Sequence, residues 1–303
     1  MKAPASFFRA LSVATIGAGM IANATAANLL ESGFDSGADF IVVGDDDSDA
    51  TFGFDYSALG IPTAPNGSDT IGLRLASNIT APNAAAGVSV GTKAQFSGAF
   101  QAKFDFWLNY HTSGGTTEYG GGGVGFSTAG APLNGLQFVG DTDGDSSTDY
   151  LLLDGGATVG FDSGSYSVFS LNNSVAENDD LQAAFPSSLP PQKQTADFGQ
   201  IQAASQPGSL GFGWHTMTLD VDGSGQATFT IDNTEFGSLS GATDGSVAVT
   251  HWDRFSSVAG NENLAFGVYD NLVVSEVAAI PEPSSTLLVG LVGLFLVGSR
   301  RRK

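Results

Sequence analysis

The sequence contains no cysteine and little positive charge. Without cysteine, the chain forms neither disulfides nor thiolate metal sites, although a large β-domain needs no disulfide to be exported. Lys and Arg together number 11 over 303 residues, against 31 Asp and Glu. Because proteins that bind nucleic acid need clustered Lys and Arg, this composition excludes nucleic acid as a partner.

The few cations are concentrated at the two ends of the chain. Lys2 and Arg9 lie at the start and four more, residues 300–303, at the end, which leaves five of the 11 between them. Of the 31 acids only Glu282 lies near the C-terminus, so the body carries 30 acids and a net charge of −25. Such a charge suits solubility outside the cell, or the binding of divalent cations.

The first 26 residues have the pattern of a secretory signal peptide. Lys2 and Arg9 form a basic start, residues 11–21 are apolar, and Ala24-Thr25-Ala26 supplies small residues before a cleavage point. This three-part order predicts a signal helix, Sec-type export machinery as a partner, and cleavage after Ala26. A buried N-terminal helix is the less favoured alternative.

An apolar stretch, residues 286–298, lies close to the C-terminus. It is short for a membrane span, which needs about 17–25 residues, but flanking serines lengthen it and long cationic side chains can reach the interface. By the positive-inside rule the cations that follow lie in the cytoplasm. We therefore expect a transmembrane helix that holds the body outside the inner membrane, with its N-terminal side out and its C-terminus in.

The C-terminal segment resembles a PEP-CTERM sorting signal. The resemblance rests on Pro281-Glu282-Pro283, the apolar stretch and the terminal cluster Arg300, Arg301 and Arg302, in this order. It implies that an exosortase recognises the Pro-Glu-Pro triplet, processes the tail and releases the protein to the cell surface or an exopolysaccharide matrix. The predicted organisation is a signal peptide (1–26), a β-sandwich domain (27–278) and a sorting and anchor segment (279–303).

Several segments of the body alternate between apolar and polar residues with a period of two, which is typical of β-strands. In residues 103–110, Phe104, Phe106, Leu108 and Tyr110 share one face, and Lys103, Asp105, Trp107 and Asn109 share the other. Residues 215–232 predict a hairpin around Asp222-Gly223-Ser224-Gly225. Further strands are expected at 39–43, 51–56, 70–75, 94–99, 123–127, 150–154, 166–171, 246–251 and 264–274.

About a dozen strands without a helical pattern predict an all-β fold, an antiparallel β-sandwich. The polar, proline-containing residues 172–208 are expected to form a long surface loop. Residues 103–127 and 251–277 resemble bodies that precede PEP-CTERM tails, and the second stretch also resembles the closing strand of laminin G-like and concanavalin A-like jelly rolls. The resemblance implies a jelly-roll sandwich, a fold that includes lectins, carbohydrate-binding modules and glucanases.

Four aspartates at alternating positions form a candidate calcium site. Asp141, Asp143, Asp145 and Asp149 occupy loop positions 1, 3, 5 and 9, and Ca²⁺ prefers six to eight oxygen ligands. The loop departs from the EF-hand pattern, since Ser146 replaces the glycine at position 6 and Leu152 the glutamate at position 12. A solvated acidic turn is therefore the alternative, and calcium is the one cofactor under consideration.

Three further residues are candidates for a specific role. Asp270 has the parity of apolar strand residues on both sides of it, so we expect it to point toward the core. There a carboxylate must be hydrogen-bonded or bind a metal; bonds to the amides of a neighbouring loop are favoured over calcium. Trp107 and Tyr119 are candidates for stacking on a sugar, with packing beneath a sheet or loop as the alternative.

The catalytic motifs in the sequence are weak. Gly87-Val88-Ser89-Val90-Gly91 matches G-x-S-x-G, but a strand-like segment follows where a nucleophile elbow needs a helix. No glutamate lies in the E-x-D-x-x-E pattern of sandwich-fold glucanases. The sequence therefore favours a structural or adhesive protein without catalysis. The alternatives are a calcium-dependent carbohydrate-binding module and a glycan-degrading enzyme.

Overall fold

A computed structural model describes residues 26–80, 86–111, 118–127, 135–142, 149–154, 167–170, 179–199, 203–253, 258 and 261–277. Ala26–Val277 forms one compact unit. The predicted signal peptide up to Thr25 and the whole predicted sorting and anchor segment lie outside the described residues. In the part of the chain that is described, no helix is long and apolar enough to cross a membrane.

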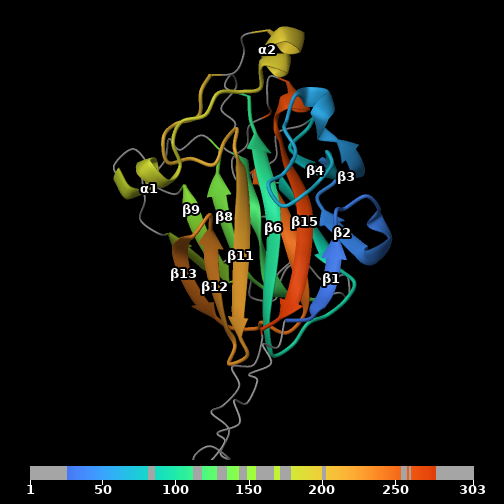
Figure 1. Cartoon of the computed structure of the whole chain (residues 1–303), viewed down its shortest axis with the longest axis vertical. Helices are drawn as coiled ribbons and strands as arrows, with labels where there is room; N and C mark the ends of the chain where they lie inside the picture. The colour runs from blue at the N-terminus through green and yellow to red at the C-terminus, as the bar shows by residue number, and fades with distance from the viewer. Residues whose placement is uncertain are drawn as a thin grey trace, which may run out of the picture. The chain divides into compact units, whose positions relative to one another are not determined.

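Two antiparallel sheets pack face to face as a jelly-roll sandwich, as the sequence predicts (Figure 1). The eight-stranded sheet has the order β13 (Thr234–Ser240), β12 (Gln226–Ile231), β11 (Trp214–Asp222), β6 (Ala99–Asn109), β15 (Phe266–Glu276), β4 (Ile71–Ser77) and β3 (Ser48–Asp55), while β1 (Asn28–Ser32) also pairs with β15. The seven-stranded sheet has the order β10 (Ser167–Ser170), β9 (Tyr150–Asp154), β8 (Leu136–Asp141), β7 (Glu118–Phe126), β14 (Ser246–Asp253), β5 (Ala86–Thr92) and β2 (Phe40–Gly44).

The alternation in the sequence decides which side chains lie between the sheets. Phe104, Phe106 and Leu108 of β6 point into the main core with Met217 and Leu219 of β11, and all are fully buried. Burial of one such side chain contributes about 1.5–3 kcal/mol. The other face of the eight-stranded sheet is called the outer face below. In the view of Figure 1, the upper end of this face is where β6 ends at Asn109 and β11 begins at Trp214. The lower end is where Ala99 of β6 pairs with Asp222 of β11.

The predicted hairpin is confirmed. β11 and β12 pair from Met217 with Ile231 to Val221 with Ala227. At the turn, the amide of Ser224 donates to Asp222 Oδ1 over 2.7 Å. Gly223 and Gly225 have φ angles of 78° and 91°, a region that glycine enters without strain.

Some strand predictions are wrong or incomplete. Residues 94–99 do not form a strand: Phe96 makes only an isolated bridge to Gly245, and Gly98, with φ 74°, turns the chain just before β6. The sequence patterns also miss β1, β5, β8 and β13. In β8 every residue is buried, so both faces are covered and the polar–apolar alternation is lost.

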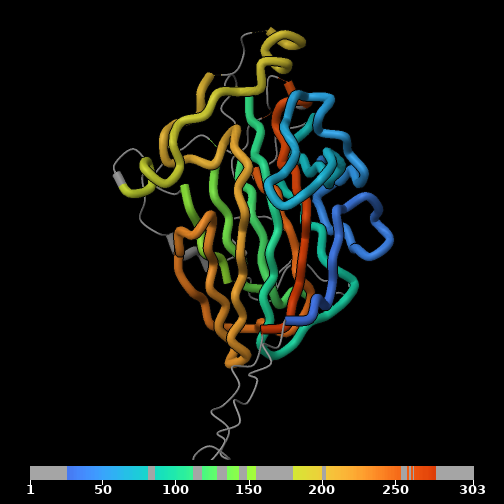
Figure 2. The backbone as a smooth tube through the Cα atoms, in the orientation of Figure 1, coloured from blue at the N-terminus to red at the C-terminus, as the bar shows by residue number. Residues whose placement is uncertain are grey.

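The region predicted as a long surface loop is more structured than expected. Its described part contains two short helices, α1 (Asp179–Ala184) and α2 (Gln192–Phe198), which lie toward the upper end of the sandwich (Figure 2). Leu181 and Phe185 are buried in the main core, and Gln194 is fully buried. These contacts turn part of the predicted loop into a cover over the upper end.

Candidate functional site

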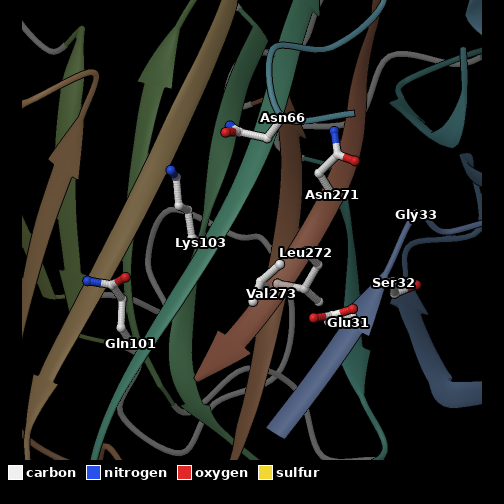
Figure 3. Close-up of a pocket in the computed structure, with 9 residues that line it drawn as sticks. All are labelled: Glu31, Ser32, Gly33, Asn66, Gln101, Lys103, Asn271, Leu272 and Val273. Atoms are coloured by element: carbon white, nitrogen blue, oxygen red, sulfur yellow. The ribbon is translucent and has the colours of Figure 1, made fainter. Parts of the chain in front are cut away.

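A groove with a volume of about 440 Å³ lies on the outer face of the eight-stranded sheet (Figure 3). It forms where β15 changes partners, from β4 at Gly267–Tyr269 to β1 at Leu272–Ser275. The lining residues are Glu31, Ser32, Gly33, Asn66, Gln101, Lys103, Asn271, Leu272 and Val273. Segments far apart in sequence therefore build one open site with both polar and apolar surface.

A β-bulge in β15 shapes this site and corrects the prediction for Asp270. The pairing of β15 with β6 shifts between Asp270 and Val273, and Asn271 has a φ angle of 54°. Asp270 consequently shares a face with Phe266 and Val268, but Leu272 points into the main core. Asp270 is buried as predicted, beside the outer-face cluster of Phe266 and Val268. The predicted parity with Leu272 and Val274 is wrong, because the bulge reverses it.

Asp270 is nevertheless buried and hydrogen-bonded. The Tyr56 hydroxyl donates to its Oδ2 over 3.0 Å, and the amide of Asn271 donates to its Oδ1 over 2.7 Å. The Tyr56 hydroxyl also accepts from the amide of Ala64, so Asp270 holds the segment 56–70 through a tyrosine rather than through amides of that segment. Burial raises the pKa of Asp270 to about 6, although the bond from Tyr56 opposes this shift.

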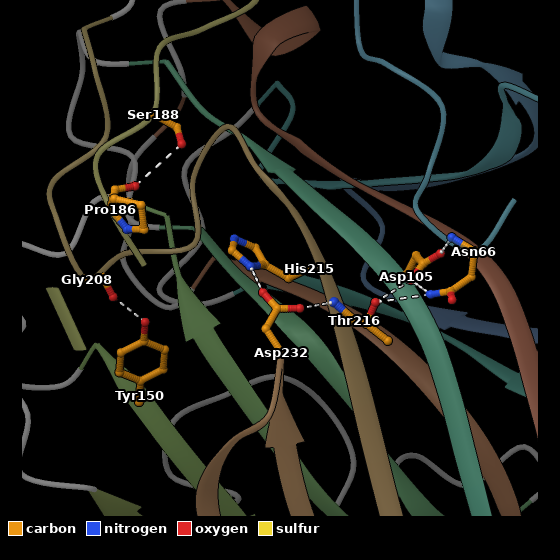
Figure 4. Close-up of polar contacts among 9 residues, drawn as sticks. All are labelled: Asn66, Asp105, Tyr150, Pro186, Ser188, Gly208, His215, Thr216 and Asp232. Carbon is orange, nitrogen blue, oxygen red and sulfur yellow. Dashed lines mark hydrogen bonds and ion pairs between the residues drawn. The ribbon is translucent and has the colours of Figure 1, made fainter. Parts of the chain in front are cut away.

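Asp105 forms a second, denser network beside the groove (Figure 4). Its Oδ1 accepts from Asn66 Nδ2 and from the Thr216 hydroxyl, each over 2.7 Å. Its Oδ2 accepts from the Asn66 amide over 3.0 Å and from Asn271 Nδ2 over 2.9 Å. Asp105 is fully buried, so these four bonds replace the water that its charge would otherwise need. Two of the residues it holds line the groove.

Trp107 and Tyr119 do not form an exposed sugar platform. Trp107 is 5% exposed and packs with Tyr56 and Phe266 on the outer face of the eight-stranded sheet. Tyr119 is fully buried in a separate cluster with Trp252 on the seven-stranded sheet. The structure does not bring the two together, and the packing alternative describes both.

Two of the four candidate calcium ligands fall within the described residues. Asp141 and Asp149 are fully buried, and the Asp141 amide donates to the Asp149 carbonyl over 2.9 Å. Together with burial, their charges raise the pKa of Tyr150 well above its usual value. Asp143 and Asp145 lie outside the described residues. Among the described residues, no group of three or more His, Cys, Asp or Glu could hold a metal, so the calcium site stays a prediction.

The sequence patterns missed a buried serine, histidine and glutamate between the sheets. Ser77 Oγ lies 3.1 Å from His251 Nδ1, and His251 Nε2 lies 3.4 Å from Glu118 Oε2. Burial lowers the pKa of His251 to about 3, and Arg74 adds to this effect, so the ring is neutral at neutral pH. All three side chains are at most 4% exposed, so this constellation presents no nucleophile to a substrate. It ties the ends of β4, β7 and β14 together.

The G-x-S-x-G segment is part of β5, which ends at Thr92, so the strand-like continuation expected after it does not form. Ser89 is buried and lies 2.6 Å from the Thr250 hydroxyl. Because the nucleophile elbow requires a helix after the serine, this segment is not one.

Comparison with known proteins identifies the C-terminal segment. Residues 279–303 match the family described as PEP-CTERM protein-sorting motif, which confirms the resemblance of this segment. No curated protein matches the chain.

Three solved structures show a distant similarity. Carbohydrate-binding module CBM66 from Bacillus subtilis is 15% identical, with 71% of this chain and 94% of that chain covered and a TM-score of 0.39. A Bacillus subtilis protein of unknown function with a galectin-like fold is 12% identical, with 82% and 96% covered and a TM-score of 0.37. A carbohydrate esterase from Shiga toxin-encoding bacteriophage phi24B is 10% identical, with 84% and 100% covered and a TM-score of 0.40. Similarity at this level does not decide between a binding module and an enzyme.

Proposed function

We propose that this protein is exported, processed by an exosortase, and retained at the cell surface or in an extracellular matrix, where its sandwich binds polysaccharide without catalysis. The matched sorting motif supports the destination. The groove on the outer face carries the proposal for the body, because it combines hydrogen-bonding side chains with the apolar Val273. In Figure 3, Gln101 and Lys103 lie on one side of Val273 and Glu31 on the other. Polar groups beside an apolar surface suit a sugar ring.

The bonding of the carboxylates supports binding over catalysis. Asp105 already accepts four hydrogen bonds, and Asp270 accepts two. A glycosidase needs one carboxyl free to donate a proton and a second to act as base or nucleophile. Near the groove these two carboxylates instead hold the segment 56–70 and the bulge of β15. Glu31 is then the one carboxylate among the lining residues, where a glycosidase needs two.

Affinity electrophoresis in gels containing soluble polysaccharides tests this function. We expect at least one polysaccharide to retard the body, Ala26–Val277, and the double variant Gln101→Ala, Lys103→Ala to lose most of the retardation. Lys193→Ala is the matched control, because Lys193 is an exposed cation on α2 that pairs with Asp197. Full retardation of the double variant would reject the groove as the binding site.

Two further measurements separate the alternatives. A calcium-dependent module would lose retardation in chelator and regain it with Ca²⁺, and Asp141→Asn would abolish that dependence. A glycan-degrading enzyme would release reducing ends from the polysaccharide that it binds. We expect no release after prolonged incubation.

A further inference from the structure

The three amide side chains of the groove make the same kind of hydrogen bond, from their NH₂ group to a carboxylate. The NH₂ groups of Asn66 and Asn271 donate to Asp105, and that of Gln101 donates to Asp220 over 2.7 Å. Within the described part of the chain, the carbonyl oxygens of these three side chains accept no hydrogen bond. Because an amide carries its donor and acceptor on opposite arms, a carboxylate that takes the NH₂ leaves the oxygen for a ligand.

The charges around the groove favour an uncharged ligand. The body as a whole carries a net charge of −25 and repels polyanions over a distance set by the ionic strength. Lys103 is the one cation among the lining residues, and Glu31 is the one acid. One amine can donate to sugar oxygens, but it does not offset the field of the body.

We infer that the groove recognises an uncharged, hydroxyl-rich polysaccharide, whose hydroxyl groups donate to the oxygens of Asn66, Gln101 and Asn271. This inference rests on the proposed function and adds the ligand class and the positioning residues. Asp105 and Asp220 do not contact the ligand; they set which arm of each amide faces it. Asp105 has the greater effect, because it is buried and holds two of the three amides.

The experiment compares uncharged polysaccharides (dextran, galactomannan, glucomannan) with carboxylated ones (alginate, polygalacturonate) by affinity electrophoresis at low and high salt. We expect an uncharged polymer to retard the protein equally at both salt concentrations, and the carboxylated polymers to have no effect. Gln101→Lys exchanges an acceptor for a donor and a positive charge. It should weaken binding of the uncharged polymer about tenfold, while Gln101→Glu, which keeps acceptor oxygens, weakens it less.

The outcomes separate the inference from the proposed function. Binding of alginate or polygalacturonate in preference to the uncharged polymers would overturn the inference and leave a polysaccharide-binding protein. Loss of binding in chelator would also overturn it, since the oxygens would then hold a cation. If Gln101→Lys bound the uncharged polymer as well as the wild type does, the Gln101 oxygen would not be an acceptor for the ligand, and the inference would be overturned. Retardation by none of the polymers would reject both.

Discussion

The upper and lower halves of one sheet face differ sharply. Along β6, the outward residues Asp105, Trp107 and Asn109 of the upper half are buried, whereas Gln101 and Lys103 of the lower half are only partly buried. All five alternate along β6 with residues that are buried in the main core. The strand pattern therefore does not produce the difference.

The cover over the upper half comes from elsewhere in the chain. Segment 56–70 is held to the sheet by Asp105 and Asp270, and its Pro62 carbonyl accepts from Trp214 Nε1 over 2.6 Å. Phe212 and Tyr110 stack beside it with a centroid distance of 4.6 Å. The upper half has become a second small core, and the lower half remains available to a ligand.

Removing the buried tryptophan of the covered half should have the largest effect on stability. Trp107→Ala leaves a cavity between the sheet and its cover, and such truncations cost about 3–5 kcal/mol of unfolding free energy. The change is measured by urea unfolding of the body. Trp107→Phe, which keeps an aromatic ring there, should lose less. If Trp107→Ala kept full stability but lost polysaccharide binding, the division of the face would be wrong.

Loss of the Asp105 carboxylate should have the next largest effect. Asp105→Ala leaves four donors without their acceptor, at a cost of about 3 kcal/mol in unfolding free energy. Asp220→Ala is the matched control, since this carboxylate lies on the same face but is exposed, and should change stability by about 0.5 kcal/mol or less. Equal losses in both variants would contradict a special role for the buried carboxylate.

The same contrast explains what the sequence predicts and what it does not. The faces of β6, β11 and β12 follow from local alternation, and the hairpin from its turn residues. The burial of Trp107 depends on contacts with residues as distant as Tyr56 and Phe266, which no local pattern encodes. The error for Asp270 comes from one extra residue, with Asn271 in a left-handed conformation that asparagine tolerates better than most residues. The groove depends on the exchange of β4 for β1 beside β15, and this pairing has no local signal.

Asp270 should make the covered half respond to pH. Its folded-state pKa is about 6, above the usual 3.8, so the folded protein binds the proton more tightly than the unfolded chain. The wild type should gain stability relative to Asp270→Asn as the pH falls from 7 toward 4, by an amount on the order of 1 kcal/mol. Urea unfolding of both proteins across this range measures it. The lowered pKa of His251 makes the folded protein less stable as the pH falls. Both proteins contain His251, so this effect cancels when the unfolding free energy of the variant is subtracted from that of the wild type. If the difference in unfolding free energy between the two proteins stayed constant across this range, Asp270 would not have the raised pKa.

The smallest stability change is expected in the open half, where the functional change is largest. Gln101 and Lys103 are only partly buried, and no segment of the described chain covers them. The double variant Gln101→Ala, Lys103→Ala should therefore shift the unfolding free energy by about 0.5 kcal/mol or less. The same variant should lose most of its polysaccharide binding. Trp107→Phe is the reverse case, with reduced stability and retained binding, so the two proteins form a crossed pair measured by unfolding and retardation. If stability and binding fell together in both, the groove and the covered half would be one unit, and the outer face would not be divided between folding and recognition.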